Sequence, residues 1–269
     1  GCNSIMGSTL LMNLLALPAF ADNYIWMIHN GVEALVVDPG DAAPVSEALK
    51  QHGLKLTAIL VTHHHGDHIG GLHALQRHDL PVYGPRVEAI EGVSHPVEDG
   101  DAVVWQGLRF SVHDVSGHTR GHIAYFLPEG LGKTDPGPLG FVGDTLFIGG
   151  CGRVFEGTMP QMHQSLNLIG QWPPSTRLCA AHEYTLSNLR FALAVEPDNT
   201  ELQSYFAHCE SLREAGLPTL PTTLATELAI NPFLRCTEPA VQSAALLHDA
   251  PDTTPESVFA ALRQWKNIF

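Results

Sequence analysis

The chain has 269 residues, of which 44% are hydrophobic and 16% are charged, a balance typical of folded globular proteins rather than disordered ones. Its 28 acidic and 14 basic residues give a formal charge of −14, which argues against nucleic acid and anionic membranes as partners. The five cysteines are dispersed and form no CxxC pair. We therefore expect neither a disulfide framework nor a thiolate zinc site, and a cytoplasmic location fits best.

The beginning of the chain is interpreted first. Residues 1–11 are expected to be a cloning remnant, with Met12 as the natural start. The apolar run at 14–20 has no basic segment before it and is followed by Asp22, which disfavours a signal peptide. No apolar run approaches the roughly 18 residues of a membrane span, so no membrane segment is expected.

Short apolar and β-branched runs follow in the first two thirds of the chain. They predict strands at 14–19, 24–29, 34–37, 58–62, 103–105, 110–115 and 123–127. Helical patterns alternate with them at 43–52, 69–77 and 159–169, which predicts a layered α/β fold. The stretch at 128–140, rich in Gly and Pro, predicts a surface loop.

From Tyr184 onward the pattern becomes mainly helical. Helices are predicted at 186–194, 200–215 and 257–265. We therefore expect two domains, a layered one at 12–183 and a smaller helical one at 184–269.

The segment at 62–68, with the sequence THHHGDH, carries the strongest chemical signal. If the chain is extended after the preceding strand, His63 and His65 point the same way, and one metal ion could take both. Asp67 and His68 come where a helix begins, so the turn can direct them to a second ion. The alternative, a tag remnant or a solvated loop, is disfavoured because the segment follows an apolar strand.

Three further residues of ligand type follow apolar, strand-like runs. They are His118 in SGHT, Asp144 in GDTLF and His182 in AAHEY. Together with the first segment they provide five histidines and two aspartates, enough for two ions if one carboxylate bridges them. We expect Asp144 to be the bridge, because a carboxylate can place one oxygen on each of two ions roughly 3.5 to 4 Å apart.

In this order, the motifs THxHxDH, GHT and GDTLF and the late histidine resemble those of the metallo-β-lactamase superfamily. The resemblance implies an αββα sandwich with two metal ions. It also implies His63, His65 and His118 on the first ion, Asp67, His68 and His182 on the second, and Asp144 between them.

Further segments make the chain similar to the glyoxalase II (hydroxyacylglutathione hydrolase) family over nearly everything after Met12. They lie at 18–24, 62–71, 143–157, 182–185, 231–235 and 262–266. The resemblance implies that the helical domain supplies basic residues for the glycine carboxylate of glutathione, which Arg263 and Lys266 match. These two residues share one helix face.

Three other residues match substrate contacts of that family. Arg153 stands where the family has a basic residue that contacts glutathione, and Tyr184 matches its substrate tyrosine. Phe155 stands where some members have tyrosine, so a hydroxyl contact is lost in this chain.

The resemblance also implies the reaction. A hydroxide between two divalent metal ions attacks the thioester carbonyl of S-D-lactoylglutathione, giving D-lactate and glutathione in the second step of methylglyoxal detoxification. A thiol has a pKa of roughly 8.5 and leaves without protonation, so no strong general acid is needed. Asp67 could orient the nucleophile. Zinc is favoured, iron and manganese stay open, and a monomer is expected.

Several alternatives are weighed beside this interpretation. Within enzymes they are a persulfide dioxygenase-like mononuclear iron enzyme and, less favoured, a lactonase or β-lactamase. Outside catalysis, the alternative is a non-catalytic metal-binding module. Among neighbouring residues, His64 should face away from the metals, His122 should be packed or hydrogen-bonded, and a nucleophilic role for Cys151 is disfavoured.

Overall fold

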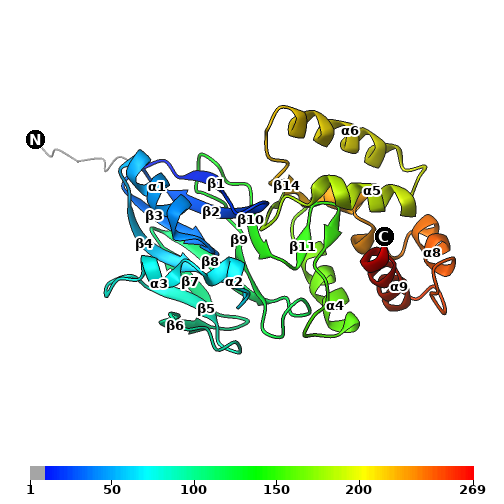
Figure 1. Cartoon of the computed structure of the whole chain (residues 1–269), viewed down its shortest axis with the longest axis horizontal. Helices are drawn as coiled ribbons and strands as arrows, with labels where there is room; N and C mark the ends of the chain where they lie inside the picture. Colours follow the sequence, from blue (N-terminus) through cyan, green and yellow to red (C-terminus); the bar gives the residue numbers. More distant parts are fainter. Residues whose placement is uncertain (1–9) are drawn as a thin grey trace, which may run out of the picture.

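The computed structural model describes residues 10–269 of the chain, which form a four-layered structure (Figure 1). Two six-stranded sheets form its centre, and helices lie on their outer faces. The fold class predicted from the sequence is thus confirmed. The expected cloning remnant lies outside the described residues except for Leu10 and Leu11.

The first sheet has the strand order β1-β2-β3-β4-β5-β6. Its first three strands are antiparallel, and β3 to β6 run parallel. Helices α1, α2 and α3 belong to the same part of the chain. The bounds are β1 Asn13–Ala19, β2 Asn23–His29, β3 Glu33–Val37, β4 Lys55–Leu60, β5 Val82–Pro85, β6 His95–Val97, α1 Ala42–His52, α2 Gly66–Ile69 and α3 Leu72–Leu75.

Strand β2 shows how the layers form. Because side chains alternate along a strand, Tyr24, Trp26 and Ile28 pack in the core between the sheets. Ile25 and Met27 point to the other side, into a core shared with α1 and α3. All five side chains are buried, so β2 is covered on both faces.

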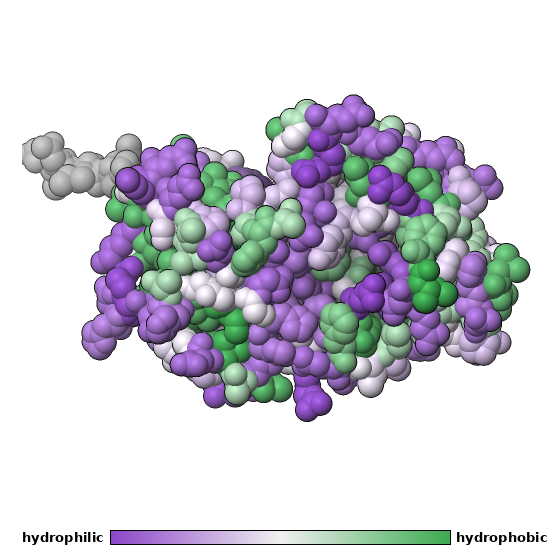
Figure 2. All heavy atoms as spheres, viewed as in Figure 1, coloured by the Kyte–Doolittle hydropathy of each residue, from purple (hydrophilic) through white to green (hydrophobic). Residues whose placement is uncertain are grey.

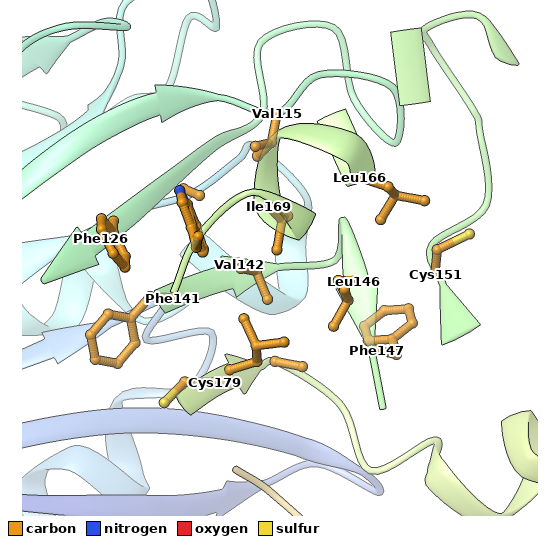
Figure 3. Packing of buried hydrophobic residues seen from close by; sticks show 14 of the residues in the cluster. Val115, Phe126, Phe141, Val142, Leu146, Phe147, Cys151, Leu166, Ile169 and Cys179 are labelled. Atoms are coloured by element: carbon orange, nitrogen blue, oxygen red, sulfur yellow. The ribbon is translucent and has the colours of Figure 1, made fainter. Parts of the chain in front are cut away.

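The second sheet has the strand order β14-β13-β10-β9-β8-β7. Leu166 and Ile169 of helix α4 pack over Val115, Val142 and Leu146 on its outer side (Figure 3). The bounds are β7 Ala102–Trp105, β8 Leu108–Asp114, β9 Ile123–Leu127, β10 Leu139–Gly143, β13 Arg177–Ala180, β14 Thr222–Thr223 and α4 Met159–Gly170, and a small hairpin is formed by β11 Leu146–Phe147 and β12 Gly150–Cys151.

The last part of the chain is helical, as predicted, and lies at one end of the molecule (Figure 1). Helix α9 packs against α4 and α8, so the helical part is joined to the second sheet's outer layer. Helices α7 and α8 and strand β14 were not predicted. The bounds are α5 Thr185–Val195, α6 Thr200–Glu214, α7 Leu224–Ile230, η1 Pro232–Leu234, α8 Pro239–Leu246 and α9 Pro255–Ile268.

The helix predicted at 69–77 is wrong in one respect, because it is divided into α2 and α3. The division falls at Gly70 and Gly71, which lie against the backbone of 39–42. A Cβ atom on Gly70 would lie 2.6 Å from the Gly40 carbonyl oxygen, and one on Gly71 would lie 2.5 Å from that of Pro39. These glycines allow backbone to touch backbone beside the histidine segment.

The outer surface is of mixed polarity. Figure 2 shows hydrophobic residues in small groups among hydrophilic ones on the face drawn there. Within residues 10–269, no helix combines the length and the apolar character that a membrane crossing would need.

The predicted loop at 128–140 is correct up to Pro138, and its last two residues belong to β10.

Candidate active site

The histidine segment at 62–68 follows strand β4 in the chain. The chain stays extended after β4, and His65 is the residue before helix α2, with φ −61° and ψ 142°. His63 is fully buried, whereas the imidazole of His64 points away and lies 2.6 Å from the Glu156 carboxylate. The alternation predicted from the extended chain is therefore present.

A first group of four side chains surrounds one point of this site. Its ligand-type atoms, from His63, His65, His118 and Asp144, all lie within 4.8 Å of one another. His118 Nε2 is 3.1 Å from His65 Nδ1 and 3.3 Å from Asp144 Oδ2. His63 Nε2 is 3.6 Å from the same carboxylate oxygen. Three nitrogens and one oxygen thus converge.

A second group lies beside the first and shares Asp144 with it. It contains Asp67, His68, His182 and Asp144, again within 4.8 Å of one another. Both His68 Nε2 and His182 Nε2 lie 3.2 Å from Asp67 Oδ2. His182 Nε2 is also 3.3 Å from Asp144 Oδ1, whereas His68 Nε2 lies 3.3 Å from Oδ2, the oxygen that the first group faces. Asp144 therefore has the position of a bridging carboxylate.

Buried atoms without partners indicate what these groups fit. Among the described residues, His63 Nε2, His68 Nε2 and Asp144 Oδ1 are buried and have no hydrogen-bond partner. Leaving such an atom unsatisfied costs about 1–3 kcal/mol, so three at one point call for a ligand. Imidazole nitrogens and carboxylate oxygens, without a thiolate, are donors for zinc, iron or manganese. The site is compatible with a dinuclear metal centre.

The outer nitrogens of the histidines are held by acceptors. His68 Nδ1 lies 2.9 Å from Asp38 Oδ2, and His182 Nδ1 lies 2.8 Å from Asp22 Oδ1. His118 Nδ1 lies 2.7 Å from the Arg153 carbonyl oxygen. Each contact fixes the ring so that Nε2 faces the centre. We did not predict Asp22 or Asp38, although Asp22 lies in a segment that resembles the family.

The charges at the centre follow from burial and from neighbours. Burial lowers the pKa of His63 to about 4. Burial alone would also lower the pKa of His182, but the neighbouring carboxylates of Asp144, Asp67 and Asp22 outweigh it and raise the pKa to about 10. Burial would raise the pKa of Asp144, yet His68 and the other ring nitrogens hold it well below the usual range. The bridging carboxylate is therefore ionised.

His122 has the packed role that the sequence predicts. It is fully buried, its ring stacks on that of His63 with centroids 4.4 Å apart, and its Nε2 accepts a hydrogen bond from the Asp144 backbone N–H at 3.1 Å. Gly143 makes this close approach feasible at φ +53°, because a Cβ there would lie 2.6 Å from the His122 ring.

A cavity of about 320 Å³ opens from the two groups toward the helical part. Three cationic residues line it, Arg153, Arg263 and Lys266. The structure thus brings the basic residues singled out in the sequence to the same cavity as the metal-ligand candidates. The other lining residues are His65, Asp67, His118, Asp144, Phe147, Cys151, Phe155, His182, Tyr184 and Asn188.

The two basic residues of α9 differ in their surroundings. Arg263 is only 2% exposed, and its guanidinium donates to the carbonyl oxygens of Cys151 at 2.6 Å and Gly152 at 3.2 Å. It therefore fastens α9 to the loop after β12, which the sequence did not predict. Lys266 has its ammonium 6.0 Å from the centre of the Phe191 ring, and burial lowers its pKa.

Two aromatic residues lie on opposite halves of the site. The Phe155 ring lies 5.3 Å from that of His118, in the first group, and Phe155 is 63% exposed. Tyr184 stacks on His182, in the second group. Cys151 is buried, and burial raises the pKa of its thiol, which agrees with the absence of a nucleophilic role.

Comparison with known proteins identifies the family. The Metallo-beta-lactamase superfamily matches residues 20–208, and Hydroxyacylglutathione hydrolase C-terminus matches residues 183–269. The hydroxyacylglutathione hydrolase of Nitrosomonas europaea is 49% identical over 263 residues, covering 96% of this chain and 97% of that protein. That of Albidiferax ferrireducens is 51% identical over 259 residues, covering 96% and 100%.

A solved structure agrees in fold. ETHE1 from Myxococcus xanthus aligns with a TM-score of 0.61 at 22% identity, over 96% of this chain and 99% of that one. At this identity the likeness shows the fold alone. The two family matches and the relatives at about half identity show that the chain belongs to the metallo-β-lactamase superfamily and, within it, to the hydroxyacylglutathione hydrolases.

Proposed function

We propose that this protein hydrolyses S-D-lactoylglutathione and other S-2-hydroxyacylglutathiones to the hydroxy acid and glutathione, the second step of methylglyoxal detoxification. One observation carries the proposal: Arg153, Arg263 and Lys266 line the same cavity as Asp67 and Asp144. In a chain with a formal charge of −14, this local positive charge favours an anionic substrate such as a glutathione thioester.

The curated relatives support the same activity. They carry the name hydroxyacylglutathione hydrolase at about half identity over nearly the whole chain. Neither a persulfide dioxygenase-like mononuclear iron enzyme nor a non-catalytic metal-binding module is favoured, because the second group of ligand-type residues is complete.

In this proposal the two groups hold two divalent ions, with zinc favoured over iron and manganese. When bound, such a pair supplies Lewis acidity that makes water a nucleophile near neutral pH and polarises the thioester carbonyl. The first ion would be held by His63, His65 and His118, the second by Asp67, His68 and His182, and both by Asp144.

Asp67 would orient the attacking water, and the leaving group needs no proton. As a ligand of the second ion Asp67 would be ionised, because a carboxylate binds a metal ion in its deprotonated form, and it could accept a hydrogen bond from the attacking water. Its side chain is 39% exposed and faces the cavity. The departing thiol has a pKa of roughly 8.5, so it leaves as thiolate without a general acid.

Substrate binding is assigned to the opposite end of the cavity. Of the pair expected at the glycine carboxylate of glutathione, Lys266 would bind it directly and Arg263, held by two carbonyl oxygens, would lie beside it. Arg153 would contact glutathione. Tyr184 and Phe155 would border the thioester, and Phe155 has no hydroxyl to donate. In this proposal residues 12–183 form the catalytic domain and 184–269 the substrate-binding domain.

We further propose a cytoplasmic monomer. The four cysteines of the described residues are free and buried, which fits a reducing compartment.

The substrate assignment is tested by comparing two thioesters with a thiol reagent. The metal-loaded protein should release thiol from S-D-lactoylglutathione. It should act at least about 10-fold less efficiently on the D-lactoyl thioester of a small neutral thiol, since a charged hydrogen bond contributes about 1.5–3 kcal/mol. Equal efficiency on both, or no thiol release, would contradict the assignment.

A further inference from the structure

The turn between β1 and β2 reaches the second group of metal-ligand candidates. Asp22 Oδ1 lies 2.8 Å from His182 Nδ1. Asn23 Nδ2 donates to Asp67 Oδ2 at 3.0 Å and to the Asp67 carbonyl oxygen at 3.4 Å. Asp22, the last residue of the turn, and Asn23, the first residue of β2, thus contact two members of one group.

The backbone holds this turn in place. Tyr24 N–H donates to the Ala181 carbonyl at 2.7 Å, and Glu183 N–H donates to that of Asp22 at 2.8 Å. Asn23 and His182 form an isolated β-bridge between these bonds. Residues 22–24 and 181–183 therefore make a short ladder that joins the two sheets directly beside the site.

The buried carboxylate of Glu183 holds this ladder through three hydrogen bonds. Glu183, with its side chain 7% exposed, accepts a hydrogen bond from the Tyr24 hydroxyl at 3.0 Å. It also accepts from the Thr219 N–H at 2.8 Å and the Thr219 hydroxyl at 2.6 Å. The position of His182 is thereby tied both to strand β2 and to the segment that follows α6.

The first group has no carboxylate within hydrogen-bond distance of its outer nitrogens. Those of His63 and His118 face a threonine hydroxyl at 2.9 Å and a backbone carbonyl at 2.7 Å, both neutral, and the outer nitrogen of His65 lies 4.0 Å from the Glu156 carboxylate. In the second group the outer nitrogens of both histidines face carboxylates, at 2.9 and 2.8 Å. A carboxylate acceptor makes the imidazole a more basic ligand and fixes its tautomer.

We infer that Asp22 and Asn23 are positioning residues of the second metal position, and that the first position does not depend on them. Asp22 orients His182 and strengthens it as a ligand, and Asn23 holds the Asp67 carboxylate toward the centre. This inference rests on the dinuclear centre of the proposed function.

The test measures metal binding without substrate. Metal-free protein is titrated with Zn²⁺ against a chromophoric chelator, comparing the parent chain with Asp22→Asn and Asn23→Ala. Asn13→Ala is the matched control for Asn23, because Asn13 lies at the other end of the same hairpin and contacts only backbone carbonyls. Asp79→Asn, at an exposed pair with Arg77, is the control for Asp22.

We expect two ions per chain in the parent and in both controls. In Asp22→Asn and Asn23→Ala one of the two bound ions should lose about 10–100-fold in affinity while the other keeps its parental affinity. Equal losses for both ions, or no loss, would overturn the inference. A parent chain that binds fewer than two ions would overturn the dinuclear centre itself, so the two failures are distinguishable.

Folding is checked separately by urea unfolding of the metal-free proteins. Asp22→Asn keeps the shape of the side chain, so it carries the test if Asn23→Ala does not fold. A metal-free Asp22→Asn as stable as Asp79→Asn, together with a selective loss of one ion, supports positioning. If a variant loses metal affinity only to the extent that its metal-free form loses stability, the positioning role is contradicted.

Discussion

Tyr184 stacks face to face on His182, with ring centroids 4.7 Å apart and an angle of 6° between the planes. Tyr184 is 36% exposed and also lines the cavity, so one side chain links a metal-ligand candidate to the space proposed for substrate. The ring and the hydroxyl of Tyr184 can therefore be tested separately.

Tyr184→Phe keeps the stacked ring and removes the hydroxyl. If the hydroxyl contacts substrate, KM should rise about 5-fold with little change in kcat, because a hydrogen bond contributes about 1 kcal/mol. Tyr184→Ala removes the ring as well and should raise KM further. Steady-state kinetics with S-D-lactoylglutathione measure both, and an unchanged KM in Tyr184→Phe would exclude the hydroxyl contact.

Arg263 and Lys266 should separate into a structural and a binding effect. Arg263→Ala leaves two buried carbonyl oxygens without their donor and should lower the free energy of unfolding by about 2–4 kcal/mol. Lys266→Ala should change stability by less than about 1 kcal/mol and raise KM about 10-fold. Urea unfolding and steady-state kinetics of both variants check this, and the reverse pattern would refute the assignment.

Gly143 is expected to be intolerant of a side chain. In Gly143→Ala the Cβ would lie 2.6 Å from Thr62 Oγ1 at φ +53°, so both steric clash and backbone strain act beside Asp144. Gly107→Ala is the control, since Gly107 has φ +78° with nothing within 4 Å. The free energy of unfolding should fall by only about 1–2 kcal/mol in the control, because of backbone strain, and by clearly more in Gly143→Ala. Equal unfolding free energies in the two variants would contradict the clash.

Glu227 should make stability depend on pH. Burial raises the pKa of its carboxyl from 4.5 to about 7, and Oε2 is buried without a partner among the described residues. The folded protein then binds more protons than the unfolded chain between pH 4.5 and 7, so the contribution of Glu227 to stability is full below about 4.5 and is lost as pH rises to about 7.

Glu227→Gln removes this titration and keeps an oxygen for the bonds from Gly149 N–H and Asn231. At pH 8 the variant should be more stable by up to about 3 kcal/mol, with a smaller difference at pH 5. Chemical unfolding with excess chelator at both pH values measures it, because metal then contributes nothing. A difference that does not change with pH would disprove the raised pKa.

Local patterns were sufficient to predict much of the fold. The apolar runs of β2, β3, β4, β8 and β9 predicted strands because each is long and apolar enough to stand out in the sequence. Strands β5 and β6 were missed because they have only four and three residues and are interrupted by Gly84 and Pro96. They are strands because β5 pairs with β4 and with β6 in the sheet.

The site likewise contains residues that local motifs predict and residues that only the fold brings into place. His63 and His65 stand in a motif whose spacing already indicates metal ligands, and Asp144 is a ligand-type residue that follows a strand-like run. The structure brings the three together. Asp22 lies 160 residues before His182, and only the register between the β1–β2 turn and 181–183 brings them within 2.8 Å. The buried carbonyl contacts of Arg263 likewise depend on how α9 packs, which no local pattern contains.

The central claim is that this chain is a thioester hydrolase whose site requires two metal ions. The most direct test adds Zn²⁺ stepwise to metal-free protein and follows thiol release from S-D-lactoylglutathione together with bound metal. We predict that activity reaches its plateau only at two ions per chain and that Asp144→Asn abolishes it. Full activity at one ion per chain, or no thiol release at two, would contradict the account.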